Sequence, residues 1–319
     1  MARDEVGTHA TDEDRELASH IPASVRFGTS SWTFQGWNNI VYSGSPTQAA
    51  LVRSGLRAYA RHPLLRTVGI DRSYYAPLTD EDLAGYSAQL PQGFLAVSKV
   101  FDEITTFAFP RHPRYGAKGG TFNPDFLNPD RVLNEVIGPY ERQFRPFAGP
   151  FVFEIAPIPE GALPSAELLS QKISALLQRL PNTFRYSFEL RNQALLTPRY
   201  LDTLRAHSAG HVINYWTAMP TVGEQLAIPG IFTSNFVVVR LMLPPYSRYE
   251  EQKAAFEPFD RLCAPQLAMR ADVIELLRQA IDRGINETFV LANNKAEGSS
   301  PLTLKALAQE IAKGALTRR

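Results

Sequence analysis

The sequence predicts an α/β fold, namely a single (β/α)8 TIM-barrel-like domain with long loops after the third and seventh strands. Three observations lead to this fold class. Eight short apolar runs recur along the chain, most of them end in a charged or amide side chain, and helical periodicity or long loops separate them. The runs begin at Val25, Thr67, Gly93, Pro150, Phe184, His211, Phe236 and Thr288. Their nearly continuous apolar character is typical of strands covered on both faces.

Start and stop signals mark several of the intervening helices. Residues 45–48 read Ser-Pro-Thr-Gln, which predicts a helix with Ser45 as its N-cap and Pro46 in its first turn. A second predicted helix opens at Pro164 and ends by Pro181. A third ends at Gly284, and the last helix of the chain starts at Pro301.

The length of 319 residues is compatible with one large domain, since α/β barrels often exceed the usual domain size. The first 20 residues contain two arginines and six acidic residues, so they carry a charge of −4 and the remainder carries +5. Residues 1–22 also lack a periodic apolar stripe, so we expect an acidic, disordered tail there. Residues 23–319 are expected to form the barrel domain.

The composition narrows the cellular setting. Cys263 is the one cysteine, so an intramolecular disulfide is impossible and a reducing compartment fits. No run approaches the ~20 apolar residues of a membrane span, and the acidic N-terminus lacks the apolar region of a secretory signal. We therefore expect a cytoplasmic protein without a membrane partner.

Six segments together resemble the YecE-like family, also known as domain of unknown function 72. They are Gly28–Trp37, Val68–Tyr75, the segment ending at Lys99, Phe188–Arg191, the segment ending at Arg240, and Ala292–Pro301. The resemblance spans about residues 25–313 and implies a TIM-barrel-like fold without an established activity. The chain is a divergent member: Gly69 stands where the family usually has Glu, and Thr106 where it has His. If those residues are catalytic in the family, the chemistry has changed or been lost here.

The ends of the middle strands supply the candidate catalytic residues. Lys99, Glu154 and Glu189 end the third, fourth and fifth strands, and neighbouring strand ends in a barrel lie ~5 Å apart. General acid–base catalysis by the carboxylates and Schiff-base formation by Lys99 both suit this set. The alternative is a mutually compensated polar plug that includes Arg191.

Other strand ends supply candidate ligand-binding residues. Arg191 and Arg240 could grip a carboxylate or phosphate, although each could equally pair with a neighbouring Glu. The remaining candidates are Trp32, Asp71, Tyr75, Asn214, Trp216, Asn293 and Asn294. For the aromatic residues, packing under the loops is the alternative. The start of the last helix is a further candidate anion site, and simple N-capping by serine is its alternative.

No metal site is expected, because none of the six histidines ends a predicted strand. No cofactor is predicted either, although Mg²⁺ held by Asp71, Glu154 and Glu189 stays open.

The sequence thus predicts binding, with or without transformation, of a small anionic or sugar-like ligand at the C-terminal mouth of the barrel. A non-catalytic ligand-binding or scaffold protein is the first alternative. A nucleic-acid-binding barrel is the second, based on Arg111, Arg114, Lys118 and Arg248 in the two long loops. The modest net charge makes that alternative the weakest.

Overall fold

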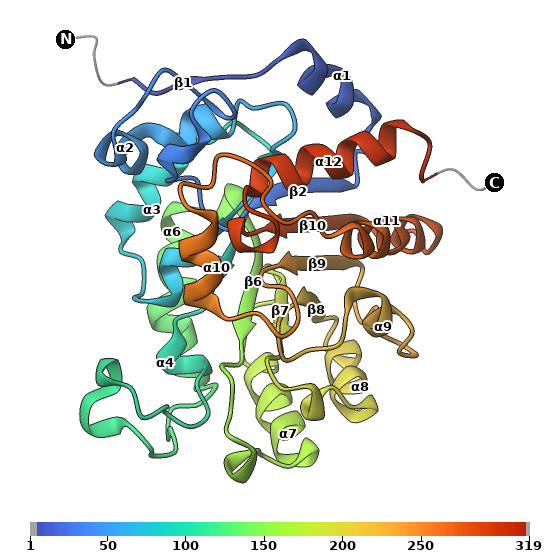
Figure 1. Ribbon diagram of the computed structural model, residues 1–319. Coiled ribbons are helices and arrows are strands. Elements are labelled where there is room, and N and C mark those ends of the chain that lie inside the picture. Colours follow the sequence, from blue (N-terminus) through green and yellow to red (C-terminus); the bar gives the residue numbers. More distant parts are fainter. Residues whose placement is uncertain (1–4, 317–319) are drawn as a thin grey trace.

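The computed structural model describes residues 5–316 and contains a closed, eight-stranded parallel barrel (Figure 1). Its strands are β2 (Val25–Thr29), β4 (Thr67–Ile70), β5 (Leu95–Lys99), β6 (Ala148–Glu154), β7 (Tyr186–Glu189), β8 (Gly210–Tyr215), β9 (Phe236–Leu241) and β10 (Glu287–Ala292). They follow one another around the barrel in chain order, and β10 closes on β2 with Thr288 opposite Val25. All eight predicted strands and the fold class are confirmed.

Two apolar layers hold the barrel together. Inside the ring, a small cluster fills the lower lumen; it contains Val97, Val152, Val212, Phe236, Val238, Phe289 and Leu291. Outside it, a much larger cluster lies between the strands and the surrounding helices. Each strand therefore buries side chains on both faces, which explains the continuous apolar runs in the sequence.

The helices surround the barrel (Figure 1). They are α1 (Asp12–His20), α2 (Gln48–Tyr59), α3 (Asp80–Ser87), α4 (Asp102–Thr105), α5 (Pro129–Arg131), α6 (Gly138–Gln143), α7 (Ala166–Leu177), α8 (Pro198–Ala206), α9 (Val222–Leu226), α10 (Tyr249–Phe256), α11 (Leu267–Asp282) and α12 (Ser300–Ala312). A π-helical segment, Val132–Ile137, joins α5 to α6.

Most predicted helix boundaries lie within a few residues of the observed ones. Ser165 caps α7 directly after Pro164, and Gly284 has the left-handed φ of 68° expected after α11. The start of α2 differs, because Thr47 rather than Ser45 is the N-cap. The Thr47 hydroxyl accepts the N–H of Ala50, so this threonine, and not the preceding serine, satisfies the first turn.

The expectation of a disordered tail differs from the structure over residues 5–22. Strand β1 (Gly7–Thr8) pairs with β3 (Tyr42–Ser43), and a reciprocal capping box between Thr11 and Asp14 begins α1. Leu17 is buried in the core, and Asp14 forms an ion pair with Lys305 of α12 at 3.0 Å. Asp14, one of the acidic residues expected to keep this segment in solvent, therefore caps α1 and pairs with a lysine instead. Residues 1–4 of the predicted tail lie outside the described residues.

The two long connections follow β5 and β9, as predicted, and lie on the side of the barrel where the strands end (Figure 1). The first contains α4 and a 3-10 segment, Pro113–Lys118, stapled by an isolated bridge between Ala108 and Phe122. The second contains α10. These connections build the walls above the strand ends, which is where barrels place their binding sites.

Across residues 5–316, no helix is both long enough and apolar enough to cross a membrane.

Candidate ligand-binding site at the barrel mouth

Six charged side chains converge where the strands end, and we call this set the mouth cluster. Lys99, Glu154, Glu189 and Arg240 come from β5, β6, β7 and β9, while Arg191 and Asp71 follow β7 and β4 directly. All except Asp71 have side chains no more than 9% exposed. Three cations and three carboxylates therefore share a nearly dry volume.

Arg240 joins opposite sides of the barrel. Its Nη1 contacts Glu154 Oε2 at 2.8 Å and also Glu189 Oε2, while its Nη2 lies 3.2 Å from both carboxylate oxygens of Asp71. Burial disfavours the charged guanidinium, but the charges of Glu189, Asp71 and Glu154 outweigh it and raise the pKa of Arg240 well above its ordinary value. Arg240 is therefore always charged, and it connects carboxylates from opposite sides of the barrel mouth.

One carboxylate oxygen of Glu154 contacts three cationic side chains. Its Oε2 lies 2.8 Å from each of Lys99 Nζ, Arg191 Nη2 and Arg240 Nη1. Burial alone would raise the pKa of Glu154, but the charges of Arg191, Lys99 and Arg240 hold it well below its ordinary value. Glu154 is thus an ionised acceptor, and it does not have the raised pKa of a general acid.

Arg191 is the member of the mouth cluster that still has hydrogen-bond donors without a partner. Its Nη2 contacts Glu154 Oε2 at 2.8 Å and Glu189 Oε1 at 2.7 Å. Its Nε and Nη1 are buried and have no hydrogen-bond partner among the described residues. The guanidinium lies over the ring of Trp216, with its central carbon 4.0 Å from the ring centroid. Two buried donors without acceptors are costly, which marks this position as one that a ligand could complete.

Asn214 of β8 orients Glu189 rather than facing an open space. Its Nδ2 donates to Glu189 Oε1 at 3.2 Å and to the Leu190 carbonyl at 2.8 Å. Gln225 in turn bonds the backbone of Asn214.

On the β5 side, aromatic rings extend the cationic part of the site. Lys99 Nζ lies 3.6 Å from the ring centroid of Tyr74, and Arg114 from the long connection lies 5.1 Å from that of Tyr75. Burial, together with the charges of Glu154 and Asp102, raises the pKa of Tyr74. Tyr74 therefore provides a neutral ring for Lys99.

Asp102, which the sequence-based site did not include, lies beneath this aromatic group. It is fully buried, it accepts the Tyr115 hydroxyl at 2.8 Å, and Arg114 Nη2 lies 2.8 Å away. Burial raises its pKa although Tyr115 and Arg114 oppose the change. A raised carboxyl pKa near a ligand site is typical of proton-transfer groups, and the only sequence signal was its place after Lys99 and Phe101.

The structure brings together seven of the predicted site residues in addition to Lys99 and Glu154: Asp71, Glu189, Arg191, Asn214, Trp216, Arg240 and, at the outer rim, Tyr75. Tyr75 is 63% exposed and packs edge-on against Tyr74.

Three other predicted residues serve the surrounding loops. Trp32 is buried edge-on against Tyr86. Asn293 caps the short turn after β10, its Oδ1 accepting the N–H of Lys295 at 3.0 Å. The Oδ1 of Asn294 accepts from Trp37 Nε1 at 3.3 Å and from the N–H and hydroxyl of Ser300. The start of α12 is therefore buried and capped by the Asn294 side chain, whereas Ser299 at the N-cap position makes no side-chain capping bond of the kind considered as the alternative to an anion site.

Within residues 5–316, no group of three or more His, Cys, Asp or Glu side chains is arranged to hold a metal ion. The three carboxylates considered for Mg²⁺, those of Asp71, Glu154 and Glu189, all contact Arg240. Guanidinium groups thus take the positions that a cation would need.

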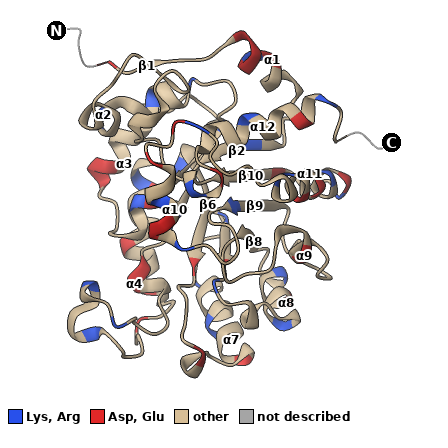
Figure 2. Ribbon diagram, viewed as in Figure 1, with Lys and Arg blue, Asp and Glu red and all other residues tan. Residues whose placement is uncertain are grey.

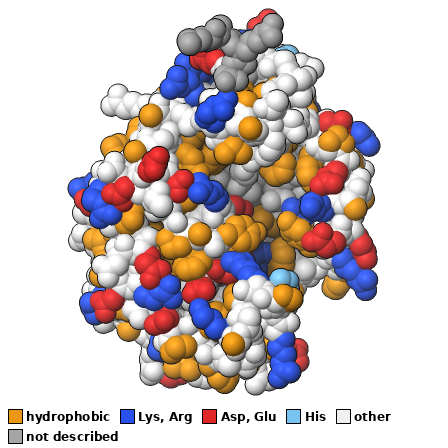
Figure 3. Space-filling model, turned by 90° about the vertical axis from the view of Figure 1, so that its left-hand side faces the viewer, with side chains coloured by type: hydrophobic (Ala, Val, Ile, Leu, Met, Phe, Trp, Pro, Cys, Tyr) orange, Lys and Arg blue, Asp and Glu red, His pale blue; other side chains and the backbone are white. Residues whose placement is uncertain are grey.

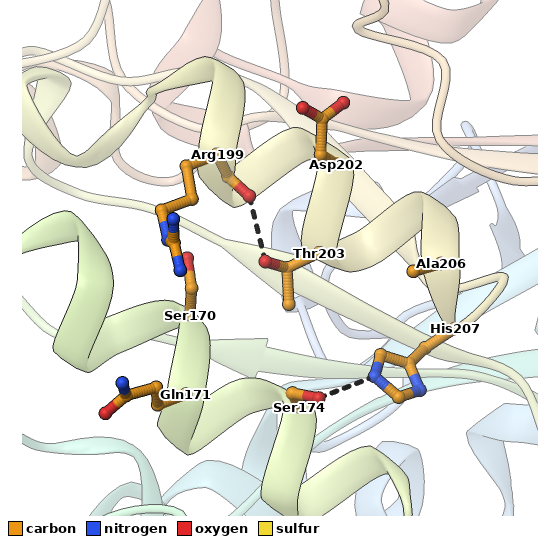
Figure 4. Close-up of a pocket in the computed structure, with 8 residues that line it drawn as sticks. All are labelled: Ser170, Gln171, Ser174, Arg199, Asp202, Thr203, Ala206 and His207. Atoms are coloured by element: carbon orange, nitrogen blue, oxygen red, sulfur yellow. Dashed lines mark hydrogen bonds between the residues drawn. The ribbon is translucent and has the colours of Figure 1, made fainter.

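A second hollow, of about 560 Å³, lies between α7 and α8 on the outer layer (Figure 4). In it, Ser174 Oγ and His207 Nε2 are 2.8 Å apart. Asp202 points away from this pair in Figure 4 and contacts Arg205 instead, at 2.5 Å. The geometry of a Ser-His-Asp triad is therefore not met, and the strand ends are the better candidate site.

Charge on the surface is mixed rather than segregated. Figure 2 shows Lys and Arg interspersed with Asp and Glu along the chain. The face toward the strand ends shows both signs, together with hydrophobic side chains, around a central hollow (Figure 3). A continuous basic stripe, which nucleic-acid binding favours, is not visible on this face.

Comparisons with known proteins agree with this architecture. The family model described as "Protein of unknown function DUF72" matches residues 26–318. The sequence matches no curated protein.

Two solved structures of similar fold come from the same family. One is a DUF72 family protein from Enterococcus faecalis, 18% identical over 91% of this chain and 95% of its own, with a TM-score of 0.59. The other is a DUF72 family protein from Thermotoga maritima, 17% identical over 90% of this chain and 99% of its own, with a TM-score of 0.57. With a family model that covers nearly the whole chain and a TIM barrel whose strand ends gather the motif residues, the protein belongs to the DUF72, or YecE-like, family.

Proposed function

We propose that the mouth cluster binds a small ligand rich in acceptor oxygens, such as a carboxylate or an acidic sugar. The observation that carries this proposal is Arg191, which is 3% exposed, lies on Trp216 and keeps two N–H-bearing nitrogens without an acceptor.

The charge balance refines the ligand class. Three cations offset three carboxylates, so the mouth cluster does not have a large excess of positive charge. What Arg191 lacks is an acceptor atom, and a single carboxylate or a set of sugar hydroxyls would provide one. The ring of Trp216 offers a flat apolar face beside it, as sugar and aromatic sites often do.

The same geometry favours binding over two of the chemistries considered from the sequence. Glu154 is held ionised by three cations, so it is a poor proton donor. Lys99 Nζ forms an ion pair with Glu154 at 2.8 Å, so this nitrogen already contacts a carboxylate and is not free to attack a carbonyl group, as Schiff-base formation requires.

A second candidate function, acid–base catalysis, is favoured by one observation. Asp102 has a raised pKa and a buried Oδ1 without a hydrogen-bond partner among the described residues. It would be the proton-transfer group if the bound ligand is transformed.

The proposal is tested by titration with glucuronate, which combines a carboxylate with sugar hydroxyls. Calorimetry of the wild-type protein should detect binding, and Arg191→Met should weaken it roughly tenfold or more, because a hydrogen bond to a charged group is lost. Arg199→Met, which removes an exposed arginine of α8 paired with Glu167, is the matched control and should bind as the wild type does. Equal affinity in all three proteins would refute a site at Arg191.

A further inference from the structure

A pocket of about 500 Å³ lies at the rim of the mouth, on the side of β2 and β10, and we call it the rim pocket. It lies between the loop after β2, the turn after β10, and α10. Its lining residues are Thr33, Phe34, Gln35, Gly36, Gln48, Tyr249, Lys253, Glu257, Pro258, Phe259 and Lys295. None of these belongs to the mouth cluster, and the volume is typical of small-molecule pockets.

Lys295 is the unusual member of this lining. The residue is only 8% exposed, yet among the described residues its Nζ has neither a carboxylate nor a hydrogen-bond partner. The contact that the structure gives it is the ring of Tyr249, whose centroid lies 4.2 Å from Nζ. An ammonium on a largely buried side chain that lacks an anion is less favourable than one in open water, and a ring face offsets only part of that cost.

The loop that carries Lys295 is held on both sides. Asn293 accepts its backbone N–H, and Asn294 is bonded to Trp37 and Ser300. Glu297, fully buried, forms an ion pair with Arg270 of α11 at 2.9 Å. The amine is therefore preorganised in the pocket rather than carried by a mobile loop.

The opposite wall adds further features that favour an anion. The first residue of α2, Gln48, lines the rim pocket, so the positive end of that helix borders it. Lys253 of α10 contributes a second ammonium, which is shared with Glu257 at 3.9 Å. Lys295 thus supplies a positive charge that is not paired with an acidic side chain of the rim pocket.

Aromatic side chains make up the rest of the lining. Phe34 and Phe259 pack edge-to-face with centroids 5.6 Å apart, and Tyr249 lies across from them on α10. Gly36 allows the two loops to meet, because a Cβ at this position would overlap the Pro258 carbonyl oxygen. A flat or apolar group fits against this wall.

We infer that the rim pocket binds a small organic phosphate, with its phosphate on Lys295 and Lys253 near the start of α2 and its apolar part against Phe34, Phe259 and Tyr249. Barrels commonly hold phosphate above their seventh and eighth strands, which are β9 and β10 here. This site is independent of Arg191 and goes beyond the function proposed for the mouth cluster.

The test is calorimetric titration with phenyl phosphate, inorganic phosphate and phenol. The wild-type protein should bind phenyl phosphate more tightly than either fragment. Lys295→Met should weaken phenyl phosphate binding roughly tenfold or more, the scale of one charged hydrogen bond, while retaining the apolar stem of the side chain. Lys253→Met, on an exposed part of α10, should weaken it less.

Two controls separate this site from others. Lys172→Met, on the outer helix α7, and Arg199→Met, on the outer helix α8, should both bind phenyl phosphate as the wild type does. Binding that is absent in the wild type, unchanged in Lys295→Met and Lys253→Met, or weakened as much in the two control variants would overturn the inference. Because Lys253 is on the surface, its variant still decides the matter if Lys295→Met does not fold.

Discussion

The two ends of the barrel both contain charged side chains that cross the lumen, but they use them differently. At the N-terminal end, Glu287 of β10 pairs with Arg26 of β2 at 2.6 Å and with Arg185, which precedes β7. These side chains are 21–29% exposed, and the guanidinium groups lie over Phe236 and Phe289. At the mouth, the paired side chains are mostly below 10% exposed, and Arg191 retains unpartnered nitrogens.

This difference indicates at which end of the barrel all the charged groups have partners without a ligand. Arg26 and Arg185 both have an acidic partner and access to water. The charged groups at the N-terminal end therefore close the barrel and stabilise the fold without a ligand. The mouth cluster is dry and leaves donors unsatisfied, which costs stability and is expected where binding has priority over packing.

The largest expected effect is at the mouth. Arg240→Met should lower the free energy of unfolding by about 3–5 kcal/mol, because it leaves Glu189, Glu154 and Asp71 short of a shared buried cation. Chemical denaturation at neutral pH measures this change. A loss below 1 kcal/mol would mean that water enters the mouth cluster, and the contrast between the two ends would disappear.

Lowering the pH should reduce the stability contributed by the two ends of the barrel over different pH ranges. Burial lowers the pKa of His211, at the start of β8, to about 4 from its ordinary 6.5. The unfolded chain therefore takes up a proton first, so the stability contributed by neutral His211 is complete above about pH 6.5 and is lost as the pH falls toward 4. The loss amounts to about 3 kcal/mol. Glu154, with its lowered pKa, contributes stability that is lost only at a lower pH.

Denaturation curves between pH 7 and 4 check this order. The free energy of unfolding should decline across that range in the wild-type protein, and His211→Gln should make the decline shallower. An unchanged pH dependence in the variant would show that His211 is not the group responsible.

The smallest expected effect is at the N-terminal end. Arg185→Met should cost only about 1 kcal/mol, because Glu287 keeps Arg26 and partial contact with water. Thermal unfolding of this variant beside Arg240→Met gives the comparison directly. Equal losses in the two variants would contradict the distinction drawn between the ends.

The sequence predicted the barrel well, because each strand is a local apolar run and closure follows from eight such runs. It also predicted the membership of the mouth cluster, since residues that end parallel strands meet at one edge. What it could not predict is how the charges are divided. Whether Arg191 or Arg240 would be fully paired depends on side-chain reach across the lumen, and only the structure resolves this.

Three differences between the sequence-based prediction and the structure have physical causes. Asn294 lies two residues after the end of β10, and its short amide accepts hydrogen bonds from Trp37 and Ser300, so it holds a loop together. The sequence pattern does not point to Lys295, because the environment of this residue depends on α10, which lies more than 35 positions away in the chain. The order at residues 5–22 gives no periodic apolar stripe in the sequence, because the few apolar residues of α1 pack against α12.

The crossing position of Arg240 has a consequence for how this family member can change over time. One guanidinium is shared by carboxylates from three separate strand ends, so no one of these four residues can be exchanged without disturbing the others. Substitutions here should be tolerated only in coordinated sets, and Arg191 belongs to the same set because it contacts both Glu154 and Glu189. The site should therefore acquire a new specificity more readily at Trp216, which meets these charged residues through its ring on Arg191, than at the charged residues themselves.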